Sequence, residues 1–171
     1  ALDYQNFLAT CKGGSDIDAS ALKGTRLLCC DANKGDNDAL TLDPRNKEML
    51  SGITYLSDGI MEYQDTPPFD CFAIQNDIDK ILRLNGKIDS EHICRQDTST
   101  QLVKHRKDVF QNTEQICIDC LTRGILTVEW LDSKIQECLS RERREDFAGV
   151  AIFVYKTYLN RLQERRHLQE G

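Results

Sequence analysis

The chain has 171 residues, of which 40% are hydrophobic and 29% charged, a composition typical of one ordinary globular domain rather than of a disordered chain. Its formal net charge of −6 argues against a protein that coats nucleic acid by electrostatics alone. No run of about 18 uncharged apolar residues and no secretory signal segment is present, so we expect a cytoplasmic protein without a membrane partner.

The charge is unevenly distributed along the chain. Residues 1–100 carry 10 Lys and Arg against 17 Asp and Glu, whereas residues 101–171 carry 12 against 11. Any contact with nucleic acid is therefore expected to be local.

The first 44 residues consist of short apolar pieces separated by turns. Cys11 is followed by a Gly-Gly turn, and Cys29-Cys30 leads into a polar turn or helix start at residues 31–36. Residues 40–44 are expected to be extended, because Pro44 biases its predecessor away from helix. Strands, turns and polar corners of this kind suit a small site better than a core.

A β-hairpin is predicted next. Two short strands, 51–56 and 59–63, flank Ser57-Asp58-Gly59, and Asp-Gly supplies the positive-φ positions of tight hairpin turns. Pro67-Pro68 then breaks the chain.

From residue 74 onward the apolar residues recur at helical spacing. The first helix contains Ile74, Ile78, Ile81 and Leu82 and is expected to stop at Asn85-Gly86. Three more helices are predicted, from Leu102 to Cys120, with Arg123-Gly124 closing the segment, over 128–139, and from Phe147 to Leu162.

Eight cysteines are many for an intracellular chain: Cys11, Cys29, Cys30, Cys71, Cys94, Cys117, Cys120 and Cys138. Cys11 and Cys30 each lie beside a turn, where a zinc ion can be reached by thiolates at about 2.3 Å, but two cysteines do not complete a tetrahedral site. The missing ligands would come from Cys29, from distant cysteines or from upstream residues. Buried thiols and a disulfide scaffold remain the alternatives.

Three segments together resemble the HNH nucleases associated with retrons and Septu systems, the small nuclease partners of an ATPase in bacterial anti-phage defence. They are Asn6 to Cys11, Cys30-Asp31-Ala32-Asn33-Lys34-Gly35-Asp36, and Leu42-Asp43-Pro44. The segments Ile53-Thr54-Tyr55, Asp58-Gly59-Ile60, Ile81 to Asn85, and Leu102 with Arg106 are similar to the region that follows the motif in that family, so the likeness covers about the first two thirds of the chain.

The resemblance implies a ββα-metal unit that contains a structural zinc ion and a catalytic divalent cation such as Mg²⁺. Cys11 and Cys30 would form one zinc-binding pair, and Asn6 would brace the loop. Asp31 would bind the catalytic ion with help from Asn33, and Lys34 would meet a phosphate. The implied partners are DNA or another nucleic acid and the ATPase subunit of a defence complex.

The chain also departs from the family pattern. The family's first Cys-x-x-Cys pair and its catalytic histidine precede the Asn, and Cys29 occupies the position where the family has His. We therefore expect a fragment or a degenerate copy that does not hydrolyse DNA by the HNH route.

Other motifs are weaker. Cys117-Ile118-Asp119-Cys120 has Cys-x-x-Cys spacing but lies in a helical pattern, which favours packing over redox chemistry. His105 lies on a basic helical face that is expected to be solvated, with a phosphate contact as the alternative.

These observations predict an α+β fold. Residues 1–66 would form a truncated ββα-metal-like nuclease unit with a hairpin, and residues 67–171 a helical bundle packed on it in one compact domain. The leading hypothesis for function is the HNH nuclease component of a bacterial anti-phage defence system, which hydrolyses nucleic acid, here as a fragment or degenerate copy. The alternative is a non-catalytic helical interaction protein, which could be secreted and held by disulfides.

Overall fold

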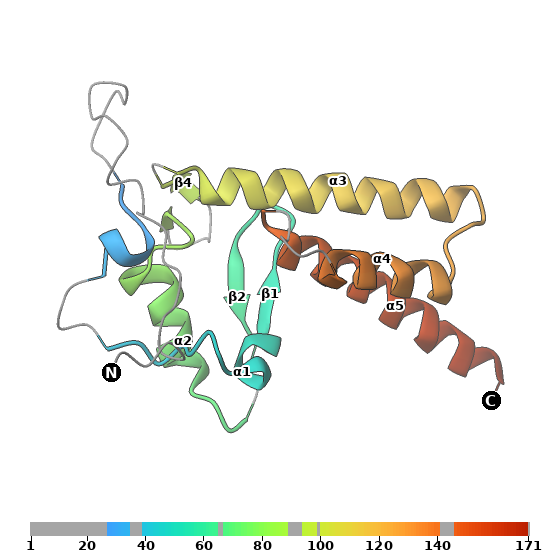
Figure 1. The fold of residues 1–171 in the computed structure, drawn as a ribbon, viewed down its shortest axis with the longest axis horizontal. Coiled ribbons are helices and arrows are strands. Elements are labelled where there is room, and N and C mark those ends of the chain that lie inside the picture. Colours follow the sequence, from blue (N-terminus) through green and yellow to red (C-terminus); the bar gives the residue numbers. More distant parts are fainter. Residues whose placement is uncertain are drawn as a thin grey trace. The chain divides into compact units, whose positions relative to one another are not determined.

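The computed structural model describes residues 27–34, 39–64, 67–88, 94–98, 100–140 and 146–170 (Figure 1). The chain separates into two compact units. One, which we call the mixed unit, contains the described residues up to Thr54 together with Ile60–Val103. The other, the helical unit, contains Tyr55–Gly59 and the described residues from Lys104 onward. The fold class is α+β, as the sequence predicts.

The mixed unit is built from short elements. In chain order these are a 3₁₀ helix η3 (Cys30–Ala32), α1 (Lys47–Ser51), β1 (Ile53–Tyr55), β2 (Met61–Tyr63), α2 (Cys71–Asn76), a π-helical continuation η4 (Asp77–Ile81), β3 (Lys87–Ile88) and β4 (Cys94–Gln96). Strands β1 and β2 pair in one two-stranded sheet, and β3 and β4 form an antiparallel second one. The β1–β2 hairpin confirms the prediction, and Gly59 takes the positive φ of 91° in its loop.

The helix predicted from Ile74 is present, and it begins earlier and ends earlier than expected. Asp70 caps its start by accepting a hydrogen bond from the Ala73 amide at 3.0 Å. Its last turn is π-helical, with the Leu82 amide donating to the Asp77 carbonyl at 2.8 Å. The helix stops at Ile81 because Arg83, with a φ of 48°, leaves the helical conformation before Asn85-Gly86 is reached.

Polar side chains form hydrogen bonds with backbone amides and carbonyls that the short strands leave without a strand partner. Asp77 is 2% exposed, and its Oδ2 accepts the amides of Thr41 and Leu42 at 2.6 and 2.8 Å. The segment predicted to be extended at 40–44 is therefore held by a carboxylate rather than by a strand partner among the described residues. Asn85, fully buried, accepts from the Met61 amide at 2.7 Å and donates to the Met61 carbonyl at 2.8 Å.

The helical unit contains α3 (Leu102–Thr122) from Lys104 onward, α4 (Val128–Ser140) and α5 (Ala148–Glu170) (Figure 1). All three predicted helices are confirmed, and α5 continues beyond residue 162. Gly124, with a φ of 69°, closes α3 as expected. The three helices share a core whose buried members are Cys117, Cys120, Leu126, Leu131, Ile135 and Tyr155.

Ile116 in α3 is 46% exposed, because the buried stripe of this helix runs through Thr113, Cys117 and Cys120 at intervals of four and three residues. Ile116 lies one position before Cys117 and so points away from the centre of that stripe.

Replacing Asn85 by Ala should lower the free energy of unfolding by about 2–4 kcal/mol, because it leaves the buried amide of Met61 without a partner and leaves the Met61 carbonyl only the longer hydrogen bond from Nε2 of Gln75, at 3.3 Å. Urea denaturation of the full chain measures this. Asn160→Ala, at an exposed position of α5, is the matched control and should leave the midpoint unchanged or slightly raised. If Asn85→Ala and Asn160→Ala had equal urea midpoints, Asn85 would not have the stabilising role assigned to it here.

The stability of the helical unit should fall at alkaline pH. Burial raises the pKa of the Cys117 thiol from its ordinary value of 9.0 to about 11. Because the unfolded chain releases this proton first, the stabilisation is complete below about pH 9 and is lost as the pH rises through about 11.

The measurement is the urea midpoint at about pH 8 and about pH 10.5. Cys117→Ala should show a smaller alkaline loss than the parent chain, whereas Cys71→Ala, at a half-buried thiol of the mixed unit, should show the parental loss. An identical pH dependence in all three proteins would refute the role of Cys117.

Candidate functional site

The turn that follows Cys29 is a compact 3₁₀ structure. Cys29 is extended, and Cys30 then adopts a φ of 52°, a left-handed conformation that is costly for a residue with a side chain. The Cys30 carbonyl accepts the amides of Asn33 and Lys34, both at 3.1 Å. This turn, residues 29–34, is called the cysteine turn below.

The cysteine turn caps the helix formed by α2 and η4. The last carbonyls of a helix have no partner within the helix. Here the Cys30 amide donates to the Leu82 carbonyl at 2.7 Å, and Nδ2 of Asn33 donates to the carbonyls of Lys80 and Ile81 at 3.0 and 2.8 Å. Three hydrogen bonds therefore fix the turn to a helix end about fifty residues further along the chain.

Two sulfur atoms lie side by side in the cysteine turn. Sγ of Cys30, half-buried, is 3.8 Å from Sγ of Cys29, which is fully buried and lies 3.3 Å from Oγ1 of Thr100. Two thiolates that bind one zinc ion tetrahedrally at about 2.3 Å are separated by about 3.8 Å. The spacing therefore fits half of a zinc site. Within the described ranges no group of three or more His, Cys, Asp or Glu residues is placed to hold a metal.

The other predicted site residues divide into three groups. Asn6 and Cys11 lie outside the described residues. The backbone of Asp31 belongs to η3, but its side chain is not among the described ones. Asn33 and Lys34 lie in the cysteine turn with Cys30, and the amide nitrogen of Asn33 is engaged by the two helix carbonyls. The structure thus brings Cys30, Asn33 and Lys34 into one turn.

A basic hollow lies at the end of the same helix. It has a volume of about 690 Å³ and is lined by Leu27, Asp79, Lys80, Arg83, Gly86, Lys87 and Gln96. Neither Lys80, Arg83 nor Lys87 forms an ion pair with a described residue, so three cations face one carboxylate across the hollow. Such a local excess of positive charge attracts anions, even though the whole chain is acidic.

Asp79 does not neutralise the hollow through an ion pair. Its Oδ1 accepts from Nδ2 of Asn85 at 2.7 Å, and its Oδ2 accepts from Nε2 of Gln75 at 2.9 Å. Both oxygens therefore face neutral amide donors.

Sequence reasoning named Cys29 as one source of a further ligand, but it missed the basic hollow. Lys80, Arg83 and Lys87 recur at intervals of three and four residues, which is a signal for one face of a helix, but Arg83 and Lys87 lie beyond the helix end. Only the fold of this segment places the three cations around one space.

The weaker motifs have structural explanations. Cys117 and Cys120 are thiols buried in the core of the helical unit, which confirms that this Cys-x-x-Cys packs. His105 is exposed and stacks on Phe147, with ring centroids 5.8 Å apart. Cys71 is the first residue of α2 and is half-buried.

No protein-family model, no curated protein and no solved structure matches this chain. None of the helices in the described ranges combines the length and the apolar character needed to cross a bilayer.

Proposed function

We propose that this chain is an HNH-type nuclease component of a bacterial anti-phage defence system that works beside an ATPase, with the cysteine turn as its metal-binding corner. The observation that carries the proposal is the contact between two segments of the resemblance. Residues 30–36 and 81–85 are far apart in the sequence, yet Cys30 and Asn33 bind the helix end at 80–82 directly.

The other segments of the resemblance also supply buried polar contacts. In the mixed unit, Asn85 binds both backbone groups of Met61, the residue that follows Asp58-Gly59-Ile60. In the helical unit, Arg106 is 4% exposed, and its Nε donates to the Gly59 carbonyl at 2.7 Å. A buried charge-assisted hydrogen bond is a strong constraint on which residue can occupy a position. The residues on which the resemblance depends thus include some whose buried polar contacts few other residue types could make, which supports the resemblance.

The donor set of the cysteine turn fits a structural zinc ion. Cys30 would be one ligand, in a pair with Cys11 as the resemblance implies, and the sulfur spacing makes Cys29 a second candidate. When bound, zinc would hold the strained turn in place. The catalytic divalent cation would be bound by Asp31, with Asn33 beside it, and would polarise a phosphate.

The described residues of the site are suited to binding nucleic acid. They are not suited to activating a water molecule. Cys29, at the position where the family has its histidine, is fully buried, and its sulfur lies against Thr100. Lys34 is half-buried in the cysteine turn, where its ammonium group can contact a phosphate. The basic hollow would extend this contact along the nucleic-acid backbone.

The purified chain should contain about one zinc ion, and Cys30→Ser should reduce the zinc content severalfold, because one thiolate of a four-ligand site is lost. Inductively coupled plasma mass spectrometry on the unreduced chain measures this. The chelated parent protein should also unfold at a lower temperature than the zinc-loaded one.

Cys71→Ser is the matched control, since Cys71 is a half-buried thiol at the start of α2. It should keep its zinc. If the parent chain contained no zinc, or if both variants lost zinc equally, the cysteine turn would not be a metal-binding corner.

The triple variant Lys80→Gln, Arg83→Gln, Lys87→Gln should bind nucleic acid at least about tenfold more weakly and should lower the salt dependence by about two to three counterions. Fluorescence anisotropy with a short DNA duplex and an RNA hairpin, over a series of salt concentrations, measures both quantities. Lys107→Gln, Lys156→Gln, Arg165→Gln, on exposed positions of the helical unit, makes the same change in charge. Equal weakening by the control would show that only net charge matters.

A second candidate is a non-catalytic helical interaction protein. The observation that favours it is a stripe of exposed apolar side chains at the end of α3 and just beyond it, where Ile118, Leu121 and Ile125 are 41%, 48% and 44% exposed. Ile118 and Leu121, three residues apart, share one face of α3, and Ile125 follows in the loop beyond its end. A parent chain that contains no zinc and binds neither nucleic acid would favour this second function.

A further inference from the structure

Three cationic side chains line the basic hollow, and none of them forms an ion pair with a described residue. They are Lys80, Arg83 and Lys87. The lining also contains one carboxylate, that of Asp79, whose two oxygens accept hydrogen bonds from neutral amide groups. The lining of the hollow therefore has an excess of two positive charges.

The three cations lie on elements of the mixed unit that hydrogen bonds hold together. Lys80 lies on η4. The Gly86 amide donates to the Arg83 carbonyl at 3.2 Å and closes the turn that follows the helix. Lys87 begins β3, where it pairs with Gln96 of β4, another residue of the lining. The fold thus sets the backbone positions of the cations in advance, which lowers the entropic cost of collecting them around an anion.

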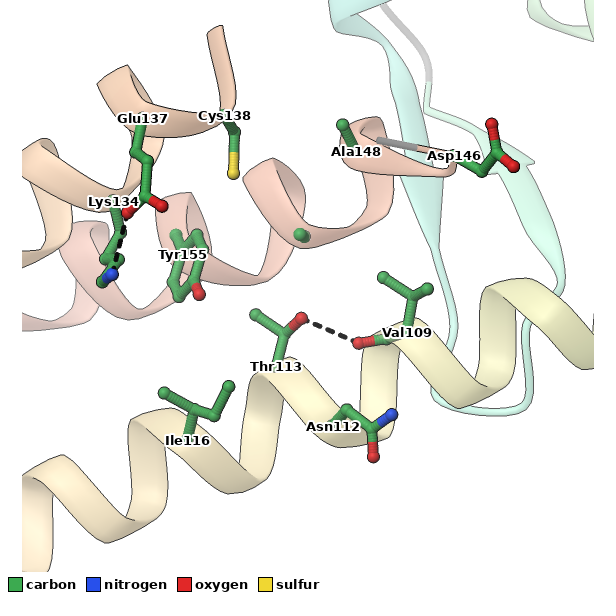
Figure 2. A pocket seen from close by; sticks show the side chains of 11 residues that line it. Val109, Asn112, Thr113, Ile116, Lys134, Glu137, Cys138, Asp146, Ala148 and Tyr155 are labelled. Carbon is green, nitrogen blue, oxygen red and sulfur yellow. Dashed lines mark hydrogen bonds and ion pairs between the residues drawn. The ribbon is translucent and has the colours of Figure 1, made fainter. Parts of the chain in front are cut away.

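The space between α3 and the pair formed by α4 and α5 has no such excess of positive charge (Figure 2). Nζ of Lys134 is paired there with Oε2 of Glu137 at 2.8 Å, and Asp146 adds a second carboxylate to the lining. These charges repel an anion. Attraction of anions is therefore a property of the basic hollow and not of every hollow in the chain.

The charge of the basic hollow favours a phosphate group with two negative charges. A phosphodiester carries one negative charge, whereas a phosphomonoester carries about 1.5 to 2 at neutral pH. Coulombic attraction is proportional to the charge of the ligand, so the hollow should hold the monoester more strongly. The Arg83 guanidinium can bind two phosphate oxygens at once, and the two ammonium groups act as point charges. The volume of about 690 Å³ also leaves room for the attached nucleoside.

We infer that the basic hollow binds a phosphomonoester dianion, such as the terminal phosphate of a nucleic-acid strand. The assignment of this group to a strand end rests on the proposed function, whereas the preference for a monoester rests on the charges of the hollow alone. Asn33 of the cysteine turn donates to the Lys80 carbonyl at 3.0 Å, so the turn and the hollow adjoin the same helix end. A terminal phosphate in the hollow is thus held beside the candidate metal-binding corner.

The first test compares thymidine 5′-monophosphate with its methyl ester, a diester that carries only one negative charge. Each probe is titrated into the ¹⁵N-labelled full chain and followed by NMR. The monophosphate should shift the amide signals of residues 79–87 and bind at least about fivefold more tightly than the ester. Equal binding of the ester, shifts confined to other residues, or no shifts at millimolar concentrations would overturn the inference.

Two variants and a control locate the contact. Replacing all three cations of the hollow by Gln should abolish the preference for the monophosphate. The control with Lys107, Lys156 and Arg165 replaced by Gln makes the same change in charge and should keep the preference. Arg83→Lys keeps the charge but loses the planar fork, so the monophosphate should bind about threefold more weakly. If one variant fails to fold, the other still decides, and a folded variant that binds like the parent chain would contradict the site.

A short DNA strand with and without a 5′-phosphate, compared by fluorescence anisotropy, identifies the source of the group. The phosphorylated strand should bind at least about fivefold more tightly, and the triple variant of the hollow should bind both strands alike. If the monophosphate binds but neither strand does, the proposed function fails while the dianion site stands. If both strands bind equally well to the parent chain, the assignment to a strand end is overturned while the nuclease proposal stands.

Discussion

The end of the helix formed by α2 and η4 must find donors for its last carbonyls, and the cysteine turn supplies them. The last carbonyls of a helix have no partner within it and need donors from elsewhere. The Cys30 amide and the Asn33 side chain satisfy three consecutive carbonyls, from Lys80 to Leu82. The same contacts impose the left-handed conformation of Cys30 and bring its sulfur beside that of Cys29. Helix capping and the candidate metal site therefore rest on the same few bonds.

The mixed unit depends on side chains that replace the backbone ladders of a larger sheet. Its strands have two or three residues each, too few to satisfy their neighbours through strand pairing alone. Asn85 and Gln75 bind the backbone of β2, and Asp77 binds the backbone amides of Thr41 and Leu42. Each of these polar side chains lies on or just after the helix formed by α2 and η4. The helix thus organises both the hairpin and the cysteine turn.

Periodicity predicted the long elements, because α3, α4 and α5 each repeat a buried stripe over several turns. The hairpin was predictable from Asp58-Gly59, whose glycine takes the positive φ that the loop requires. The helix α1 was missed because five residues give no period, although Asn46 caps it through its side chain. The pairing of β3 with β4 was missed for the same reason, and the early helix stop arises from Arg83, not from a glycine. Of the candidate site, the local sequence Cys30 to Lys34 predicted the turn, but its attachment to the helix end and the hollow depend on contacts between distant segments.

The central claim is that the cysteine turn provides thiolates to a zinc ion, and zinc K-edge X-ray absorption on the zinc-loaded full chain tests it most directly. The account predicts a shell of sulfur neighbours at about 2.3 Å that loses one sulfur when Cys30 is replaced by Ser. A shell made only of nitrogen and oxygen, or a sulfur shell unchanged by that substitution, would contradict it.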